Sequence, residues 1–120
     1  MPGEEQLLRD AYSYFANWDS DKDKFAALLA DDVQWSEKDS EIGHGEFKGK
    51  AAVMAHLQTI KDALAGVQFV SLERQGSFWR TTDEMTMQGH EHHHDCVTDV
   101  VFDGGLITKV RHCFGGGGSH

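Results

Sequence analysis

Histidines and a carboxylate interrupt an otherwise apolar pattern in the last third of the chain. One face of three expected strands carries Asp83, His94 and His112 among large apolar side chains. Ionisable groups on an apolar face cost free energy unless they are paired or face a cavity. Inside an apolar cavity such groups can perform acid–base chemistry. The spacing therefore predicts a catalytic or ligand-binding pocket.

Two turn signals set the expected register of these strands. Gln88-Gly89 suits a two-residue hairpin connection, which would make Asp83 and His94 cross-strand neighbours. That pairing predicts a general base, because a carboxylate fixes the imidazole tautomer and raises its basicity. The alternative is a buried polar pair that only specifies the register. The loop Asp103-Gly104-Gly105 sets the expected register of the next strand pair. On the inner face, Leu106 would lie opposite Phe102, Val110 opposite Thr98 and His112 opposite Cys96. On the outer face, Lys109 would lie opposite Asp99.

A histidine-rich run, Gly89-His-Glu-His-His-His-Asp, suggests metal binding at first sight. In a strand, His92 and His94 would share a face with Cys96, and zinc accepts such ligands. The run lacks an established spacing such as His-Glu-x-x-His. We therefore expect no metal site and no cofactor.

The elements that must position these residues follow from apolar periodicity. Helical spacing predicts helices over 4–17, 24–30 and 50–64, with Gly66 as the stop of the third. Strands are expected over 33–36 and 67–73, followed by a three-strand antiparallel meander from Trp79 to Phe114. Glu37–Gly45 reads as a polar loop. Cys96 then points inward and Cys113 outward, which argues against a disulfide between them.

Size and composition fit one globular domain over residues 1–114, followed by a Gly/Ser linker or tag over 115–120. The chain has 120 residues and a formal net charge of −9, which argues against nucleic acid and anionic membranes as partners. Two cysteines are too few for a disulfide scaffold, and the N-terminus lacks a signal-peptide pattern. A cytoplasmic location is the expectation. Apolar residues expected on the outer sheet face, Val97, Val101 and Ile107, predict a homodimer.

Three segments carry a resemblance to a known superfamily: "FAALLADDVQW", "GEFKGKAAVMAHL" and "DGGLITKVR". Together they resemble the ketosteroid isomerase, SnoaL-like cyclase and limonene-epoxide hydrolase superfamily, whose fold is the nuclear-transport-factor-like (NTF2-like) cone. The resemblance covers Glu5 to Phe114. It implies an α+β fold in which a cone-shaped, curved, mixed but mainly antiparallel sheet wraps around three N-terminal helices and encloses a central pocket. This fold hosts many functions, so the activity does not follow from it.

The resemblance also implies roles for single residues. Tyr12 matches the hydrogen-bond-donating tyrosine of the isomerases, and Glu37 matches their catalytic aspartate, one methylene longer. Their second oxyanion donor, a protonated aspartate, matches Thr98, which is a departure. His112 lies near the last-strand catalytic aspartate of the epoxide hydrolases. Two histidines with a carboxylate in one cone also resemble scytalone-dehydratase-like enzymes.

We therefore expect a cofactor-independent isomerase, cyclase or dehydratase that moves a proton next to a carbonyl of a small hydrophobic substrate. The alternatives are a non-catalytic binding module and an engineered catalyst on the same scaffold. The expected catalytic residues are Tyr12, Glu37, Asp83, His94 and His112. The expected substrate-binding residues are Phe15, Trp35, His56, Trp79, Met85, Cys96, Thr98 and Phe114.

Overall fold

A single curved sheet and three helices make up the described part of the protein. The structure is a computed structural model that describes residues 3–38, 45–89 and 93–114. The elements in chain order are α1 (Glu4–Ala16), α2 (Trp18–Ala26), β1 (Leu29–Lys38), β2 (Gly45–Lys48), α3 (Lys50–Ala63), β3 (Leu64–Gln75), β4 (Phe78–Met87), β5 (His93–Asp103) and β6 (Leu106–Phe114). The expected tail, 115–120, lies outside the described residues.

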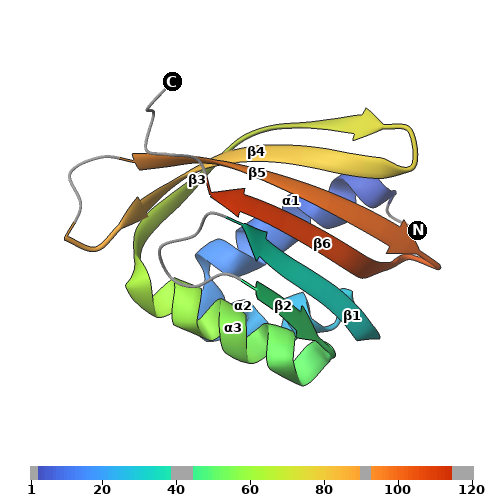
Figure 1. Cartoon of the computed structure of the whole chain (residues 1–120), viewed down its shortest axis with the longest axis horizontal. Coiled ribbons are helices and arrows are strands. Elements are labelled where there is room, and N and C mark those ends of the chain that lie inside the picture. The colour runs from blue at the N-terminus through green and yellow to red at the C-terminus, as the bar shows by residue number, and fades with distance from the viewer. Residues whose placement is uncertain (1–2, 39–44, 90–92, 115–120) are drawn as a thin grey trace.

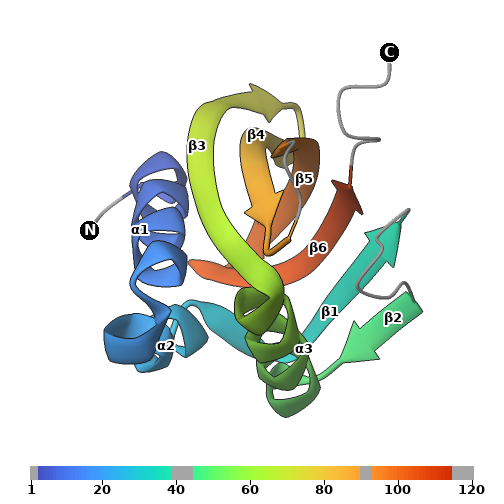
Figure 2. The same cartoon turned by 90° about the vertical axis from the view of Figure 1, so that its left-hand side faces the viewer.

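The sheet is mixed and does not close. Its strand order is β2-β1-β6-β5-β4-β3, so β2 and β3 form the two edges. The pair β1–β6 is parallel and the other pairs are antiparallel. The sheet curls strongly and the helices lie on one side of it (Figure 1, Figure 2). The expected α+β architecture, a curved mixed sheet with three helices, is confirmed.

Each helix buries an apolar stripe against the sheet. In α1 the buried residues are Leu8, Ala11 and Phe15. In α3 they are Val53, His56, Leu57 and Ile60, at intervals of three and four residues. The helix α3 starts directly after Gly49. The backbone angle φ of Gly49 is 92°, a value that residues with a side chain rarely adopt. None of the helices within the described ranges is long and apolar enough to cross a membrane.

The second helix begins earlier than the expected start at Lys24. Trp18 and Phe25 are both buried and lie two turns apart, so they anchor the two ends of one face of α2. Asp19 and Asp21 in the first turn interact favourably with the helix dipole. In the sequence these polar residues look like a break between two helices, but they occupy first-turn positions of α2, where acidic residues are favourable.

The expected loop after the first strand is also partly wrong. The strand β1 runs to Lys38 and therefore includes Glu37, and β2 begins at Gly45, the last residue of the expected loop. Residues 39–44 of that loop lie outside the described residues. In the third helix, Ala63 is the last residue, and β3 begins at once with Leu64. Gly66 is thus a strand residue at a β-bulge and does not stop the helix.

Both predicted hairpin registers are wrong by two residues over most of their length, although the predicted inner faces of β4 and β5 are right. Asp83 lies opposite Cys96, and His94 lies opposite Met85. A two-residue turn at Gln88-Gly89 therefore does not set this register, and residues 90–92, which precede β5, lie outside the described part of the chain. A shift of two keeps every side chain on its face but exchanges its neighbours.

A bulge between Val101 and Phe102 changes the pairing of β5 with β6. Val110 lies opposite Val100, His112 opposite Thr98, Phe114 opposite Cys96, and Arg111 opposite Asp99. The extra residue also exchanges the faces at the start of β6. Ile107 is therefore buried and Leu106 exposed, which reverses the expectation for both residues.

Candidate active site

A largely apolar cavity lies between the helices and the concave face of the sheet. The space between its walls, together with the open solvent at its mouth, amounts to about 600 Å³. The helices contribute Leu8, Ala11, Tyr12, Phe15, Phe25, Leu57 and Ile60. The strands contribute Trp35, Thr81, Asp83, Met85, Thr98, Val100, Ile107, Val110 and His112.

Behind one wall of the cavity, Glu37 holds three nitrogen donors. Its Oε1 lies 2.7 Å from Nδ1 of His112, and its Oε2 lies 2.9 Å from Nε2 of His56. The Nε1 of Trp35 donates to the same Oε2 at 2.8 Å. Glu37 is 3% exposed. It reaches His112 because β1 and β6 run parallel with these two residues in register.

This environment keeps Glu37 ionised and fixes the tautomers of its partners. Burial acts to raise the pKa of the Glu37 carboxyl, but hydrogen bonds from His112, His56 and Trp35 outweigh it and lower this pKa to about 2. A carboxylate only accepts hydrogen bonds, so Nδ1 of His112 must carry the proton. The lone pair of the neutral imidazole is then on Nε2, the opposite ring nitrogen.

A second polar pair lines the cavity. The hydroxyl of Tyr12 donates to Oδ2 of Asp83 at 2.6 Å and lies 2.7 Å from the Oγ1 of Thr81. Burial raises the pKa of the Asp83 carboxyl above its usual 3.8, although the hydrogen bond from Tyr12 opposes this. Burial, followed by the charge of Asp83, raises the pKa of Tyr12 well above 10. Tyr12 therefore remains a neutral donor, and the protonated form of Asp83 is favoured relative to an exposed aspartate.

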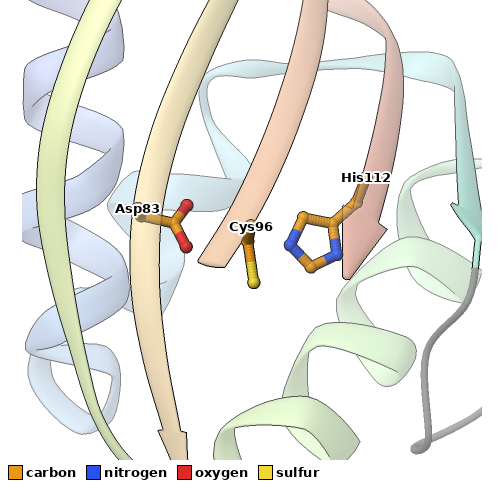
Figure 3. A group of neighbouring side chains, drawn as sticks. All are labelled: Asp83, Cys96 and His112. Carbon is orange, nitrogen blue, oxygen red and sulfur yellow. The ribbon is translucent and has the colours of Figure 1, made fainter. Parts of the chain in front are cut away.

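The arrangement brings an oriented imidazole and a carboxyl group with a raised pKa to one apolar space. Asp83 and His112 lie on the same concave surface, with their side chains turned toward one another across β5 (Figure 3). An imidazole oriented by a buried carboxylate can remove a proton, and a protonated carboxyl can donate a hydrogen bond to a developing oxyanion. Because most of the lining is apolar, both interactions gain strength from the low local polarity.

The structure brings only part of the expected site together at the cavity. Seven of the named residues line it: Tyr12, Phe15, Trp35, Asp83, Met85, Thr98 and His112. Glu37 and His56 are buried behind that lining. Cys96 is buried beside Asp83 and His112, and His94 is buried on the same sheet face but farther along β5.

Two further expected binding residues do not contribute to the described lining. Trp79 is directed to the N-terminal end of α1, where its Nε1 donates to Glu4 at 2.8 Å. The side chain of Phe114 lies outside the part of the chain that the structure describes. Asp83 and His94 are not the directly opposite pair that was expected, because Cys96 occupies the position opposite Asp83.

Sequence reasoning missed several lining residues. Leu8, Ala11, Leu57 and Ile60 repeat at helical spacing, which equally describes a filled core. Thr81 alternates with Asp83 on the inner face of β4, and that alternation was the available signal for it. The spacing alone does not show that a space remains between these side chains.

Solved structures from several sources share this fold. An NTF2-like protein of unknown function from Burkholderia pseudomallei superposes with a TM-score of 0.76 at 22% identity, over 95% of this chain and 92% of that chain. A "putative ketosteroid isomerase" from Kribbella flavida superposes with a TM-score of 0.73 at 18% identity, over 91% of this chain and 75% of that chain. A de novo designed protein with a curved β-sheet superposes with a TM-score of 0.73 at 14% identity, over 96% of this chain and 89% of that chain.

Comparisons of the sequence itself give no match: neither a protein-family model nor a curated protein matches it. The similarity to the solved structures, at these identities, concerns the backbone. The architecture of the NTF2-like proteins nevertheless extends over almost the whole chain. The chain therefore has the NTF2-like, cone-shaped α+β fold that its sequence motifs resemble.

Proposed function

We propose that the protein is an acid–base enzyme that moves a proton next to a carbonyl of a small hydrophobic substrate. The observation that carries this proposal is the Glu37–His112 contact of 2.7 Å at the wall of an apolar cavity. A buried, ionised Glu37 orients the imidazole and stabilises the imidazolium that forms when the ring accepts a proton. Glu37 is thus a positioning residue. Its low pKa makes it a poor base itself.

In this proposal Nε2 of His112 removes a proton from the carbon next to the carbonyl. Electron density moves to the carbonyl oxygen, where the protonated Oδ1 of Asp83 donates a hydrogen bond. Tyr12 supports this donor, because its bond to Oδ2 leaves the proton of Asp83 on Oδ1. The imidazolium then returns its proton to the same or another carbon of the substrate, so the protein ends the cycle unchanged.

The test measures carbon-bound proton exchange with 2-tetralone, a small bicyclic ketone. The protein is treated with EDTA, transferred to D₂O, and loss of the proton signal next to the carbonyl is followed by NMR. We expect exchange faster than in buffer that contains an equal concentration of imidazole. The variant His112→Asn keeps a donor near the position of Nδ1 but lacks Nε2. We expect it to lose roughly 10²-fold or more of the rate.

The matched control is Arg111→Gln, because Arg111 is the exposed neighbour of His112 on the opposite face of β6. It should exchange at the wild-type rate. Melting curves establish that both variants fold. Equal exchange rates in wild type and His112→Asn would refute the proposal. Binding of 2-tetralone without exchange above the buffer rate would instead favour a non-catalytic binding module.

A further inference from the structure

Asp83, Cys96 and His112 form a cluster of three potential metal ligands on the neighbouring strands β4, β5 and β6 (Figure 3). Each residue offers one ligand atom, and these atoms all lie within 4.8 Å of one another. All three side chains are buried. Two of them, Asp83 and His112, also line the cavity, which gives an ion a route to the cluster.

Two of the three residues have outer partners of the kind that orient metal ligands. Nδ1 of His112 is held by Glu37, and one ring nitrogen turns toward Cys96 and Asp83 (Figure 3). A carboxylate–histidine contact of this type fixes Nε2 as the ligating atom in metal sites. On Asp83, Oδ2 accepts the hydrogen bond from Tyr12. Its Oδ1 is buried, and the Cys96 thiol also forms a hydrogen bond with the Asp83 carboxyl.

We propose that this cluster binds a divalent transition metal of the zinc type through Sγ of Cys96, Nε2 of His112 and Oδ1 of Asp83. The fourth position would face the cavity and accept water or an oxygen of a bound molecule. A thiolate ligand favours Zn²⁺ or Co²⁺ over Mg²⁺ and Ca²⁺. One thiolate and one carboxylate neutralise the charge of the ion, so the loaded site suits its apolar surroundings.

The geometry requires only a small contraction. Tetrahedral zinc with bonds of about 2.0–2.3 Å places its ligand atoms about 3.3–3.6 Å apart. The present upper limit of 4.8 Å is close enough for side-chain rotation to close the difference. The sheet supplies the spacing, because Asp83 lies directly opposite Cys96 and His112 lies opposite Thr98, the next inward residue of β5.

This inference goes beyond the proposed function. The metal would occupy Nε2 of His112, the same atom that is proposed to remove the substrate proton. The metal-loaded protein would therefore lose that base, and Zn²⁺ would inhibit exchange of 2-tetralone. Metal binding itself is measured without substrate, so the two proposals can fail separately.

The test adds Co²⁺ to the metal-free protein and records the absorption spectrum. We expect a thiolate-to-cobalt charge-transfer band in the near ultraviolet, together with intense visible bands of a four-coordinate ion, that saturate at one equivalent. Zn²⁺ should displace the cobalt and raise the melting temperature of the wild type. The variant Cys96→Ser should lack the charge-transfer band, and Asp83→Asn should bind at least ~10-fold more weakly.

Cys113→Ser is the matched control, because Cys113 follows His112 on the opposite face of β6 and is half-buried. This variant should keep the band. Cobalt binding by other histidines of the chain would give no thiolate band, and its affinity would be the same in all variants. Absence of the band in the wild type, its survival in Cys96→Ser, or its loss in Cys113→Ser would overturn the proposal. If Cys96→Ser fails to fold, unchanged affinity in Asp83→Asn would overturn it instead.

Discussion

Glu37 connects three donors that are far apart in the sequence. Its two oxygens accept hydrogen bonds from Trp35, His56 and His112, and it is almost fully buried. A buried carboxylate is stable only when such donors compensate its lost hydration. The three contacts therefore determine the protonation of His112 and its orientation at the cavity.

The sequence could identify Glu37 only through its resemblance to the isomerases. Within "SEKDSE" it reads as one acid among several in a solvated loop. Its burial depends on β1 extending to Lys38 and on a parallel partner strand near the other end of the chain. Neither feature has a local signal. By contrast, the inward orientation of Asp83 and His112 followed from simple alternation along their strands.

Replacing Glu37 should change how stability depends on pH. The folded-state pKa of about 2 lies below the ordinary 4.5, so the ionised carboxylate stabilises the fold above pH ~4.5 by about 3 kcal/mol, and this is lost as the pH falls toward 2. Asp83 has a raised pKa and contributes in the opposite direction. Urea unfolding of Glu37→Gln between pH 2.5 and 7 should therefore show a flatter acid limb.

The exposed Glu73 provides the control for that experiment. Glu73→Gln should keep the acid dependence of the wild type. An unchanged acid limb in Glu37→Gln would show that the carboxylate gains nothing from its three donors in the folded protein.

Removing the hydroxyl of Tyr12 should destabilise the protein. Tyr12→Phe leaves Oδ2 of Asp83 without its 2.6 Å donor, and an unsatisfied buried acceptor costs about 1–3 kcal/mol. Chemical denaturation at pH 7 measures this loss. Tyr14→Phe is the matched control two positions away in α1, and we expect a change within about 0.5 kcal/mol. Similar losses in the two variants would contradict the assigned role of the Tyr12 hydroxyl.

At the scale of elements, the sequence predicted the kinds of element better than their partners. The first and third helices and the last three strands could be located because their apolar periods are regular. The second helix was expected over 24–30 but lies at Trp18–Ala26, and β1 begins at Leu29 within the expected range. The register could not, because neither the shift of two residues between β4 and β5 nor the bulge in β6 has a signal in the alternation of apolar residues. A shift of two residues leaves the alternation unchanged. This is why the Asp83–His94 neighbours were wrong while both residues still face inward.

The bulge in β6 makes a testable distinction between two adjacent residues. Ile107 lines the cavity and is 3% exposed, whereas Leu106 is 39% exposed. Ile107→Ala should cost about 2–4 kcal/mol of unfolding free energy, and Leu106→Ala less than about 1 kcal/mol. Denaturant titration of both variants measures the difference. If Leu106→Ala cost more unfolding free energy than Ile107→Ala, the register without a bulge, which the sequence alone suggests, would be the correct one.

At the scale of the whole molecule, the helices cover one side of the sheet and leave the outer face of β4, β5 and β6 uncovered (Figure 1). Val97 and Val101 lie on that face, half-buried. Ile107, which was expected beside them, faces the cavity instead. The apolar part of the outer face is therefore smaller than the sequence suggested.

The homodimer remains a prediction that this face can test. Sedimentation equilibrium should give a mass about twice the 13.4 kDa of one chain, and Val97→Lys should return the mass to that of the monomer because a buried lysine would lack a partner. Lys22→Ala, on the exposed surface of α2 and away from the outer sheet face, is the control and should remain dimeric. A wild-type mass of one chain would exclude this dimer.

The parallel pairing of β1 with β6 has a consequence for how the protein folds. Glu37 and His112 are 75 residues apart in sequence, and their contact exists only after the last strand has paired with the first. Closing so long a segment is entropically costly and slows pairing, so the chain must be nearly complete before the imidazole meets its carboxylate. A ribosome-bound chain that still lacks β6 would already contain every helix and yet have no assembled proton acceptor.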